Sequence, residues 1–162
     1  MYQHKSIKFG SDIDTDQIIA ACHLVLPSLE DMAFFCFENH RNFTEHYSFG
    51  DYIVAEENFG CGSSREQAPA VLKERGIGGI IAVSFARIFF RNAINLGVNI
   101  YECEQAVEIK QGDRLAIRDG TIKNLSQASS YTYTPHPDFL QKIVNDGGIA
   151  PHLRKHGQVC RH

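Results

Sequence analysis

Three short apolar runs constrain the fold of this chain more than any other feature. They lie at 52–56, 80–84 and 98–101, and helix-like segments at 69–75 and 85–96 separate them. A strand–helix–strand–helix–strand order predicts right-handed crossovers and therefore a parallel or mixed sheet. The second run shows no alternation of polar and apolar residues, which is typical of a strand buried on both faces. We therefore expect an α/β protein.

The loop after the first run carries the densest functional pattern. It reads Asn-Phe-Gly-Cys-Gly-Ser-Ser-Arg-Glu-Gln-Ala-Pro over 58–69. Gly60 and Gly62 permit a tight turn or a close approach to a ligand, while Arg65 and the amides of a helix start would receive an anion. Ligands gather at the carboxyl ends of parallel strands. This loop and the one after Val83 are therefore expected at the same sheet edge, around a carboxylate or phosphate site.

The same residues have plainer interpretations. Ser63 and Glu66 have the spacing of a capping box, so Ser63 is alternatively only an N-cap and Arg65 only a surface charge. The loop is not a P-loop, since no Gly-Lys-Ser/Thr follows, and not a dinucleotide fingerprint, since arginine replaces the third glycine. The thiol of Cys61, in a glycine loop near a helix start, is a candidate for a lowered pKa.

Composition narrows the class of protein. A chain of 162 residues, 43% hydrophobic and 22% charged, is expected to form one domain over 1–162. The net charge of −3 gives no footprint for nucleic acid. The N-terminus lacks the apolar core of a signal peptide and no run reaches membrane-spanning length. We expect a cytoplasmic protein without nucleic-acid or membrane contacts.

The cysteines and histidines predict no metal site. The five cysteines are odd in number and scattered, with no C-x-x-C pair. This argues against a disulfide framework and against a zinc or iron–sulfur site built from this chain alone. His152 and His156 lie four apart among basic residues, and we interpret them as a solvated helix face rather than as metal ligands.

The flanking segments complete the predicted architecture. The segment 11–19 is expected to be a loop whose aspartates bond to their own backbone, and it lacks the glycine and glutamate of an EF-hand. A polar, irregular stretch is expected at 40–50, and a polar stretch at 124–134 is expected to precede the last two helices. The other predicted elements are a strand at 5–9, an apolar segment at 20–28, a helix from the Ser28 cap to Phe37, a hairpin at 115–118 and 121–123, and helices at 137–146 and 151–155.

Four blocks occur in an order that is specific to one family. They are DTDQI at 14–18, NFGCGSSRE at 58–66, SFARIFFRNA at 84–93, and an ending that contains Phe139-Leu140, Gly147-Gly148-Ile149 and Leu153. With them the chain resembles, nearly end to end, the small subunits of 3-isopropylmalate dehydratases in their short, archaeal-like form. These correspond to the swivelling fourth domain of aconitase. The resemblance implies an α/β fold, a swivelling β/β/α domain with a mixed, largely parallel sheet flanked by helices.

The resemblance also implies an active site divided between two chains. In the family a separate large subunit carries a 4Fe–4S cluster and most catalytic residues, so this chain would bind no cofactor or metal itself. Ser63 would be the base that removes a proton from the substrate carbon, its alkoxide stabilised by loop amides and Arg65. Ser64 and Arg65 would bind a substrate carboxylate. The cluster iron would act as Lewis acid on the departing hydroxyl.

The aspartate block gains a role from the same resemblance. Asp14, Thr15 and Asp16 would form part of the substrate-binding wall, together with Gly62 of the glycine loop. Either Asp14 or Asp16 would orient Arg65 or the substrate, and the sequence does not choose between them.

Substrate choice in the family is associated with the loop at 23–27. Val25 stands there where relatives that bind a third carboxylate tend to have arginine. An apolar wall favours an alkyl substituent, so the expected reaction isomerises 2-isopropylmalate to 3-isopropylmalate by dehydration and rehydration, in leucine biosynthesis. The alternatives are the same chemistry on dimethylmalate, citraconate/methylmalate or homoaconitate, and a non-catalytic anion-binding module.

The implied partners are the iron–sulfur large subunit and a small-molecule alkylmalate. An apolar surface awaiting a partner favours self-association of the isolated chain. Arg87 and Arg91 share one helical stripe and are expected to be structural or interfacial rather than catalytic.

Overall fold

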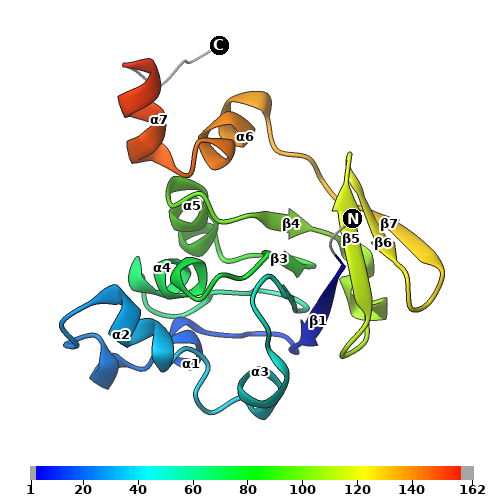
Figure 1. Ribbon diagram of the computed structural model, residues 1–162, viewed down its shortest axis with the longest axis horizontal. Coiled ribbons are helices and arrows are strands. Elements are labelled where there is room, and N and C mark those ends of the chain that lie inside the picture. The colour runs from blue at the N-terminus through cyan, green and yellow to red at the C-terminus, as the bar shows by residue number, and fades with distance from the viewer. Residues whose placement is uncertain (1–2, 158–162) are drawn as a thin grey trace.

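The computed structural model describes residues 3–157, and its framework is a seven-stranded sheet (Figure 1). The strand order is β4-β3-β2-β1-β5-β6-β7. Strands β1 to β4 pair in parallel, whereas β1–β5, β5–β6 and β6–β7 are antiparallel. The strands are His4–Lys8 (β1), Tyr52–Val54 (β2), Gly79–Ala82 (β3), Ile100–Glu102 (β4), Arg114–Arg118 (β5), Thr121–Asn124 (β6) and Ser129–Thr132 (β7). This mixed sheet confirms the predicted fold class.

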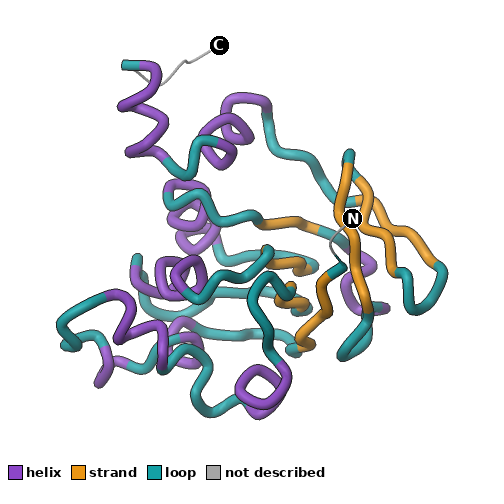
Figure 2. The backbone as a smooth tube through the Cα atoms, viewed as in Figure 1, coloured by secondary structure: helices purple, strands orange, loops and turns teal. Residues whose placement is uncertain are grey.

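The parallel strands are buried on both faces, which explains their continuous apolar runs. Ile53, Ile80 and Ile100 stand in register across β2, β3 and β4 and are at most 1% exposed. Successive side chains of a strand point to opposite faces, so the neighbouring Val54 and Ile81 join a second apolar cluster. Helices cover the first face. On the second face, buried residues of β2 and β3 pack with those of β5, β6 and β7, which lie to the side away from the helices (Figure 2).

The helices pack their apolar stripes on the face that carries Ile53. Each of α1, α2, α4, α5 and α6 contributes buried apolar residues to the same cluster as that isoleucine. The described helices are Thr15–Ile18 (α1), Leu29–Phe34 (α2), Arg41–His46 (α3), Gln67–Glu74 (α4), Arg87–Asn95 (α5), Asp138–Asn145 (α6) and Ile149–His156 (α7), with 3-10 turns at Ala21–His23 (η1) and Glu104–Glu108 (η2).

Two segments that were expected to be irregular contain helices. In 11–19 the side chain of Asp14 caps α1 by accepting from the amide of Gln17 at 2.8 Å, and the Gln17 side chain returns the bond. The expectation of a plain loop is therefore wrong. The segment 40–50 contains α3, which is anchored by Phe43, 1% exposed. Each helix is short and depends on tertiary contacts rather than on propensity.

Two further expectations near the C-terminus are wrong. The polar stretch 124–134 contains β7, because pairing with β6 and burial of Tyr131 stabilise a strand made mostly of hydroxyl residues. His152 is not on a solvated face: it is 3% exposed, since α7 packs beside α6. The basic helix is also longer than expected, Ile149–His156.

The carboxyl ends of β2 and β3 meet at one edge, as the sequence predicts. An isolated parallel bridge joins Phe59 to Phe85 beyond the two strands, and the amide of Phe59 donates to the carbonyl of Ser84 at 3.1 Å. Within residues 3–157, no helix is long and apolar enough to cross a membrane.

Candidate active site

Three loops are joined by backbone hydrogen bonds at this sheet edge. The amide of Gly60 donates to the carbonyl of Ile13 at 2.7 Å, and that of Thr15 donates to Cys61 at 2.9 Å. On the other side the amide of Ala86 donates to Phe59 at 2.9 Å. The glycine loop therefore lies between the aspartate block and the start of α5, although these segments are far apart in the sequence.

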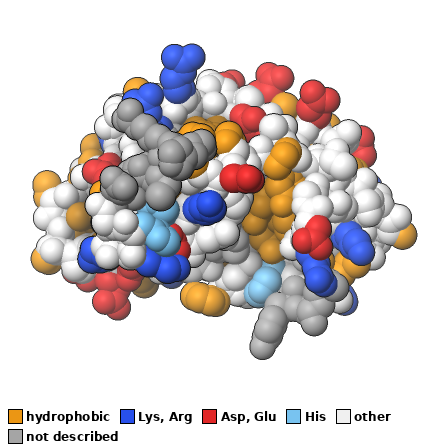
Figure 3. All heavy atoms as spheres, turned by 90° about the horizontal axis from the view of Figure 1, so that it is seen from above, with side chains coloured by type: hydrophobic (Ala, Val, Ile, Leu, Met, Phe, Trp, Pro, Cys, Tyr) orange, Lys and Arg blue, Asp and Glu red, His pale blue; other side chains and the backbone are white. Residues whose placement is uncertain are grey.

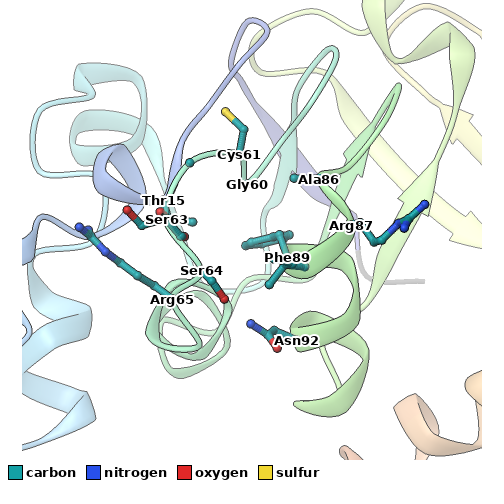
Figure 4. A pocket seen from close by; sticks show the side chains of 12 residues that line it. Thr15, Gly60, Cys61, Ser63, Ser64, Arg65, Ala86, Arg87, Phe89 and Asn92 are labelled. Atoms are coloured by element: carbon teal, nitrogen blue, oxygen red, sulfur yellow. The ribbon is translucent and has the colours of Figure 1, made fainter.

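A cavity of about 320 Å³ opens between the glycine loop and α5 (Figure 4). Ser63 and Ser64 are exposed at its rim. Phe89 and Asn92 of α5 form the opposite wall. The lining residues are Thr15, Gly60, Cys61, Gly62, Ser63, Ser64, Arg65, Ala86, Arg87, Ile88, Phe89 and Asn92. The cavity is large enough for a small organic acid.

The two glycines of the loop are required by its backbone. Gly60 and Gly62 have φ of +84° and +90°, a region that residues with a Cβ rarely adopt. A Cβ on Gly60 would overlap the ring of Phe89, and one on Gly62 would lie 3.3 Å from the Cβ of Asp14. The glycines thus let the loop approach both walls closely.

The structure distinguishes the two aspartates that the sequence could not. The guanidinium of Arg65 donates through Nη1 to Asp16 Oδ1 and to the carbonyl of Ile19, each at 3.0 Å. Hydrogen bonds from Arg65 and from the Ala21 amide lower the pKa of Asp16, which keeps this partner anionic. Asp14 instead serves as the N-cap of α1. Asp16 is therefore the residue that orients Arg65.

Arg65 is held back from the centre of the cavity. Figure 4 shows its side chain running away from Phe89 and Asn92, toward the aspartate block. Only Nη1 is engaged: Nε and Nη2 have no acceptor within the described part of the chain. The side chain is 17% exposed, so the unused Nε and Nη2 donors are accessible to an incoming anion.

Ser63 is placed by its backbone, not by a capping bond. Its carbonyl accepts from Thr15 Oγ1 at 2.9 Å, and Thr15 is buried. Helix α4 begins later, with Glu66 at the N-cap position and no side-chain capping bond, so the capping-box interpretation is wrong. Across residues 3–157, no protein group accepts a hydrogen bond from the backbone amides of residues 62–66. A free hydroxyl and free amides therefore share one loop.

Comparison with known proteins identifies the family of this chain. Residues 32–105 match the model of the aconitase C-terminal domain. The chain is 49% identical over 145 residues to 3-isopropylmalate dehydratase small subunit 1 of Archaeoglobus fulgidus, an alignment that covers 88% of this chain and 90% of the relative. The chain belongs to the 3-isopropylmalate dehydratase small-subunit family. This confirms the resemblance seen in the four sequence blocks.

Other members of the small-subunit family agree with this assignment. The small subunit of Methanosarcina mazei is 45% identical and is aligned over 91% of this chain and 93% of its own length. The crystal structure of 3-isopropylmalate dehydratase from Methanocaldococcus jannaschii superposes with a TM-score of 0.90 at 38% identity, covering 96% of this chain and 94% of that one. The aconitase-type fold is thereby confirmed.

The structure differs from the sequence expectation for Cys61, and it places Val25 away from the cavity. Burial, followed by the charges of Asp12 and Asp14, raises the pKa of the Cys61 thiol, so the expectation of a lowered value is wrong. Val25 is 86% exposed and does not line the cavity. Its neighbour His23 is held by Glu38 at 2.7 Å.

The four cysteines within the described residues do not gather. Cys22 is exposed, whereas Cys36 and Cys103 are buried in separate apolar clusters. Between residues 3 and 157, no group of three cysteines could hold a cluster. The donor set of the described chain therefore does not fit an iron–sulfur cluster.

Sequence reasoning missed the α5 wall of the cavity. Arg87, expected to be structural or interfacial, is exposed and lines the cavity. Phe89 and Asn92 line it as well. The signal available was the predicted sheet edge, where the segment after Val83 was already expected near the glycine loop. Which faces of α5 point to the loop depends on packing, which the sequence alone does not show.

Proposed function

We propose that this chain is the small subunit of a cytoplasmic isopropylmalate isomerase, which converts 2-isopropylmalate to 3-isopropylmalate in leucine biosynthesis. The observation that carries the proposal is the loop of Ser63, Ser64 and Arg65, with its free amides, at the rim of a cavity suited to a small organic acid. The names of its relatives support the same substrate.

In this proposal Ser63 is the base. The alkoxide of Ser63 takes the proton from the carbon next to the one that carries the hydroxyl and becomes a neutral hydroxyl. The departing hydroxyl group takes a proton from an acid on the large subunit and leaves as water; rehydration reverses these steps with the positions exchanged. A serine alkoxide is a strong base that needs stabilisation, and preorganised amides supply it at no reorganisation cost. No described residue accepts from or donates to the Ser63 side chain, so its hydroxyl is not committed to a structural bond.

Substrate orientation is assigned to Ser64 and Arg65. A guanidinium binds a carboxylate through charge-assisted, directional bonds. Asp16 holds Arg65 from behind through Nη1, which leaves Nε and Nη2 for the substrate. Gly62 approaches Asp14 closely, and Thr15 Oγ1 donates to the carbonyl of Ser63, so the glycine loop is fixed against the aspartate block.

A large subunit would complete the site. The 4Fe–4S cluster that we assign to that partner supplies a Lewis acid for the departing hydroxyl. The cavity of this chain is open toward solvent on the side of the exposed serines, which leaves room for a second wall. Neither subunit should therefore turn over substrate alone.

The proposal is tested by anaerobic reconstitution with a cluster-bearing large subunit. The absorbance of the unsaturated intermediate is followed on addition of isopropylmalate, then of dimethylmalate, citraconate and homoaconitate. We expect activity only in the mixture and the highest kcat/KM with isopropylmalate. Activity of this chain alone, or binding without turnover of any malate, would contradict the proposal.

Asp16→Asn is expected to lower kcat/KM by roughly 10–100-fold, because a displaced guanidinium misplaces the substrate. The loss should appear mainly as a rise in KM, since in this proposal Arg65 contacts the carboxylate and not the reacting carbon. The matched control is Asp119→Asn, which removes the carboxylate from another Asp–Arg pair, that with Arg118 at 3.1 Å on an exposed turn. Equal kinetics for the two variants would exclude the positioning role.

Val25→Arg tests the substrate loop. If Val25 faces the substituent in the complete enzyme, an arginine there should shift the ratio of kcat/KM values toward homoaconitate by about tenfold or more. Val107→Arg is the control, because Val107 is also exposed but belongs to η2. An unchanged ratio in Val25→Arg would show that this loop does not select the substrate.

A further inference from the structure

A compact set of metal-ligating side chains lies outside the active-site cavity, where α6 ends and α7 ends. Asp146 is the C-cap residue of α6, and His152 and His156 are four residues apart on α7. Asp146 Oδ2 lies 2.7 Å from His152 Nδ1 and 3.0 Å from His156 Nε2. One ligand atom from each residue lies within 4.8 Å of the other two. Histidine, basic and acidic side chains gather at the left of Figure 3, where α7 lies.

We propose that Asp146, His152 and His156 form a binding site for a divalent transition-metal ion, with Zn²⁺ the best match. Two imidazoles and a carboxylate are ligands that Zn²⁺ prefers, and three protein ligands leave a fourth position for water. Tetrahedral bonds of about 2.0–2.1 Å place ligand atoms roughly 3.3 Å apart. The Asp146–His152 and Asp146–His156 atom pairs therefore need to separate by roughly 0.6 and 0.3 Å, and the two imidazole nitrogens, which lie within 4.8 Å of each other, must reach the same spacing.

The surroundings favour a cation at this point. Asp146 is the C-cap residue of α6 and His156 lies in the last turn of α7, and the free carbonyls at helix C-termini carry partial negative charge. The Asp146 side chain is 11% exposed and that of His152 is 4% exposed, so the site is already largely desolvated. Two of the three ligands are thus fixed by packing, whereas His156, at 41%, has room to adjust.

Lys155 does not occupy the position of the metal. Its ammonium donates to Asp146 Oδ1 at 2.9 Å, whereas both imidazoles contact Oδ2. A donor on the second carboxylate oxygen is the kind of outer contact that orients a ligand.

A bound ion would join the end of α6 to the last turn of α7. Anything that binds the native state and not the unfolded state raises the unfolding temperature with concentration. The inference is independent of the proposed catalytic function, since it uses none of the residues that line the active-site cavity.

The test is calorimetric titration of the metal-stripped full chain with Zn²⁺, followed by thermal unfolding with and without the ion. We expect one saturable site and a higher unfolding temperature. His156→Gln should weaken binding by at least about tenfold, since even loss of an outer-shell contact costs about 10–100-fold. His46→Gln is the matched control, because His46 is exposed and contacts no described acidic side chain.

The variants also exclude binding elsewhere. His156→Gln retains all five cysteines, so zinc held by thiols would bind it as tightly as the unmodified chain, and that result would overturn the proposal. Absence of saturable binding to the unmodified chain would overturn it as well, and the cluster would then be a hydrogen-bonded contact between helices. Asp146→Asn, which keeps the side-chain volume, should lose affinity in parallel with His156→Gln.

Discussion

Replacing Ser63 with alanine should lower kcat of the reconstituted enzyme by about 10²–10⁴-fold, which is the usual cost of removing a general acid–base group. The fold should be unaffected, because the described structure gives the Ser63 side chain no hydrogen bond, and its carbonyl, which accepts from Thr15, remains. Steady-state kinetics with isopropylmalate, together with co-elution of the variant with the large subunit, measure the two expectations separately.

The control for this variant is Ser130→Ala, an exposed serine on β7 with no described side-chain bond. It should retain full activity. Activity of Ser63→Ala within about tenfold of the unmodified enzyme would exclude Ser63 as the base. Loss of co-elution would instead show that the serine acts in assembly.

Replacing Gly60 with alanine should lower the free energy of unfolding by about 4 kcal/mol, from a left-handed conformation and from overpacking. The backbone at Gly60 has φ of +84°, and a Cβ there would overlap the ring of Phe89. Phe89 is 2% exposed and belongs to the main core cluster, so its ring cannot shift without disturbing that packing. Because native proteins are stable by only about 5–15 kcal/mol, the change should be plain in urea unfolding at equilibrium.

Gly112→Ala separates the two contributions. Its φ of +81° is nearly the same, but a Cβ there would meet nothing within 4 Å. It should therefore cost only the conformational part, about 1–2 kcal/mol. Equal losses in the two variants would show that contact with Phe89 contributes nothing and that the glycine loop can move away from α5.

The architecture was largely predictable because its decisive signals are local. The runs around Ile53 and Ile80 are apolar at consecutive positions since both faces of the parallel strands are buried, and that pattern exists in the sequence before any folding. The glycine loop was equally visible, because Gly60 and Gly62 are demanded by backbone angles. The order of four motifs was enough to indicate the family.

Elements stabilised by distant partners were not predictable. Helix α1 and strand β7 contain mostly polar residues, and they form because Ile18 is buried in the main core and Tyr131 pairs across β6. The burial of His152 has the same origin, since α6 covers a helix whose own sequence suggests exposure.

The residues of the candidate site can be read from the chain: a glycine loop with two serines and an arginine, and a block of two aspartates. How these residues are used depends on the folded structure. Asp14 and Asp16 look alike in the chain, but Arg65 lies 49 positions from Asp16 and reaches only that one. Likewise burial, followed by the charges of Asp12 and Asp14, raises the pKa of the Cys61 thiol. Electrostatic partners are set by distance in space, and for segments this far apart in the chain that distance exists only after the sheet has formed.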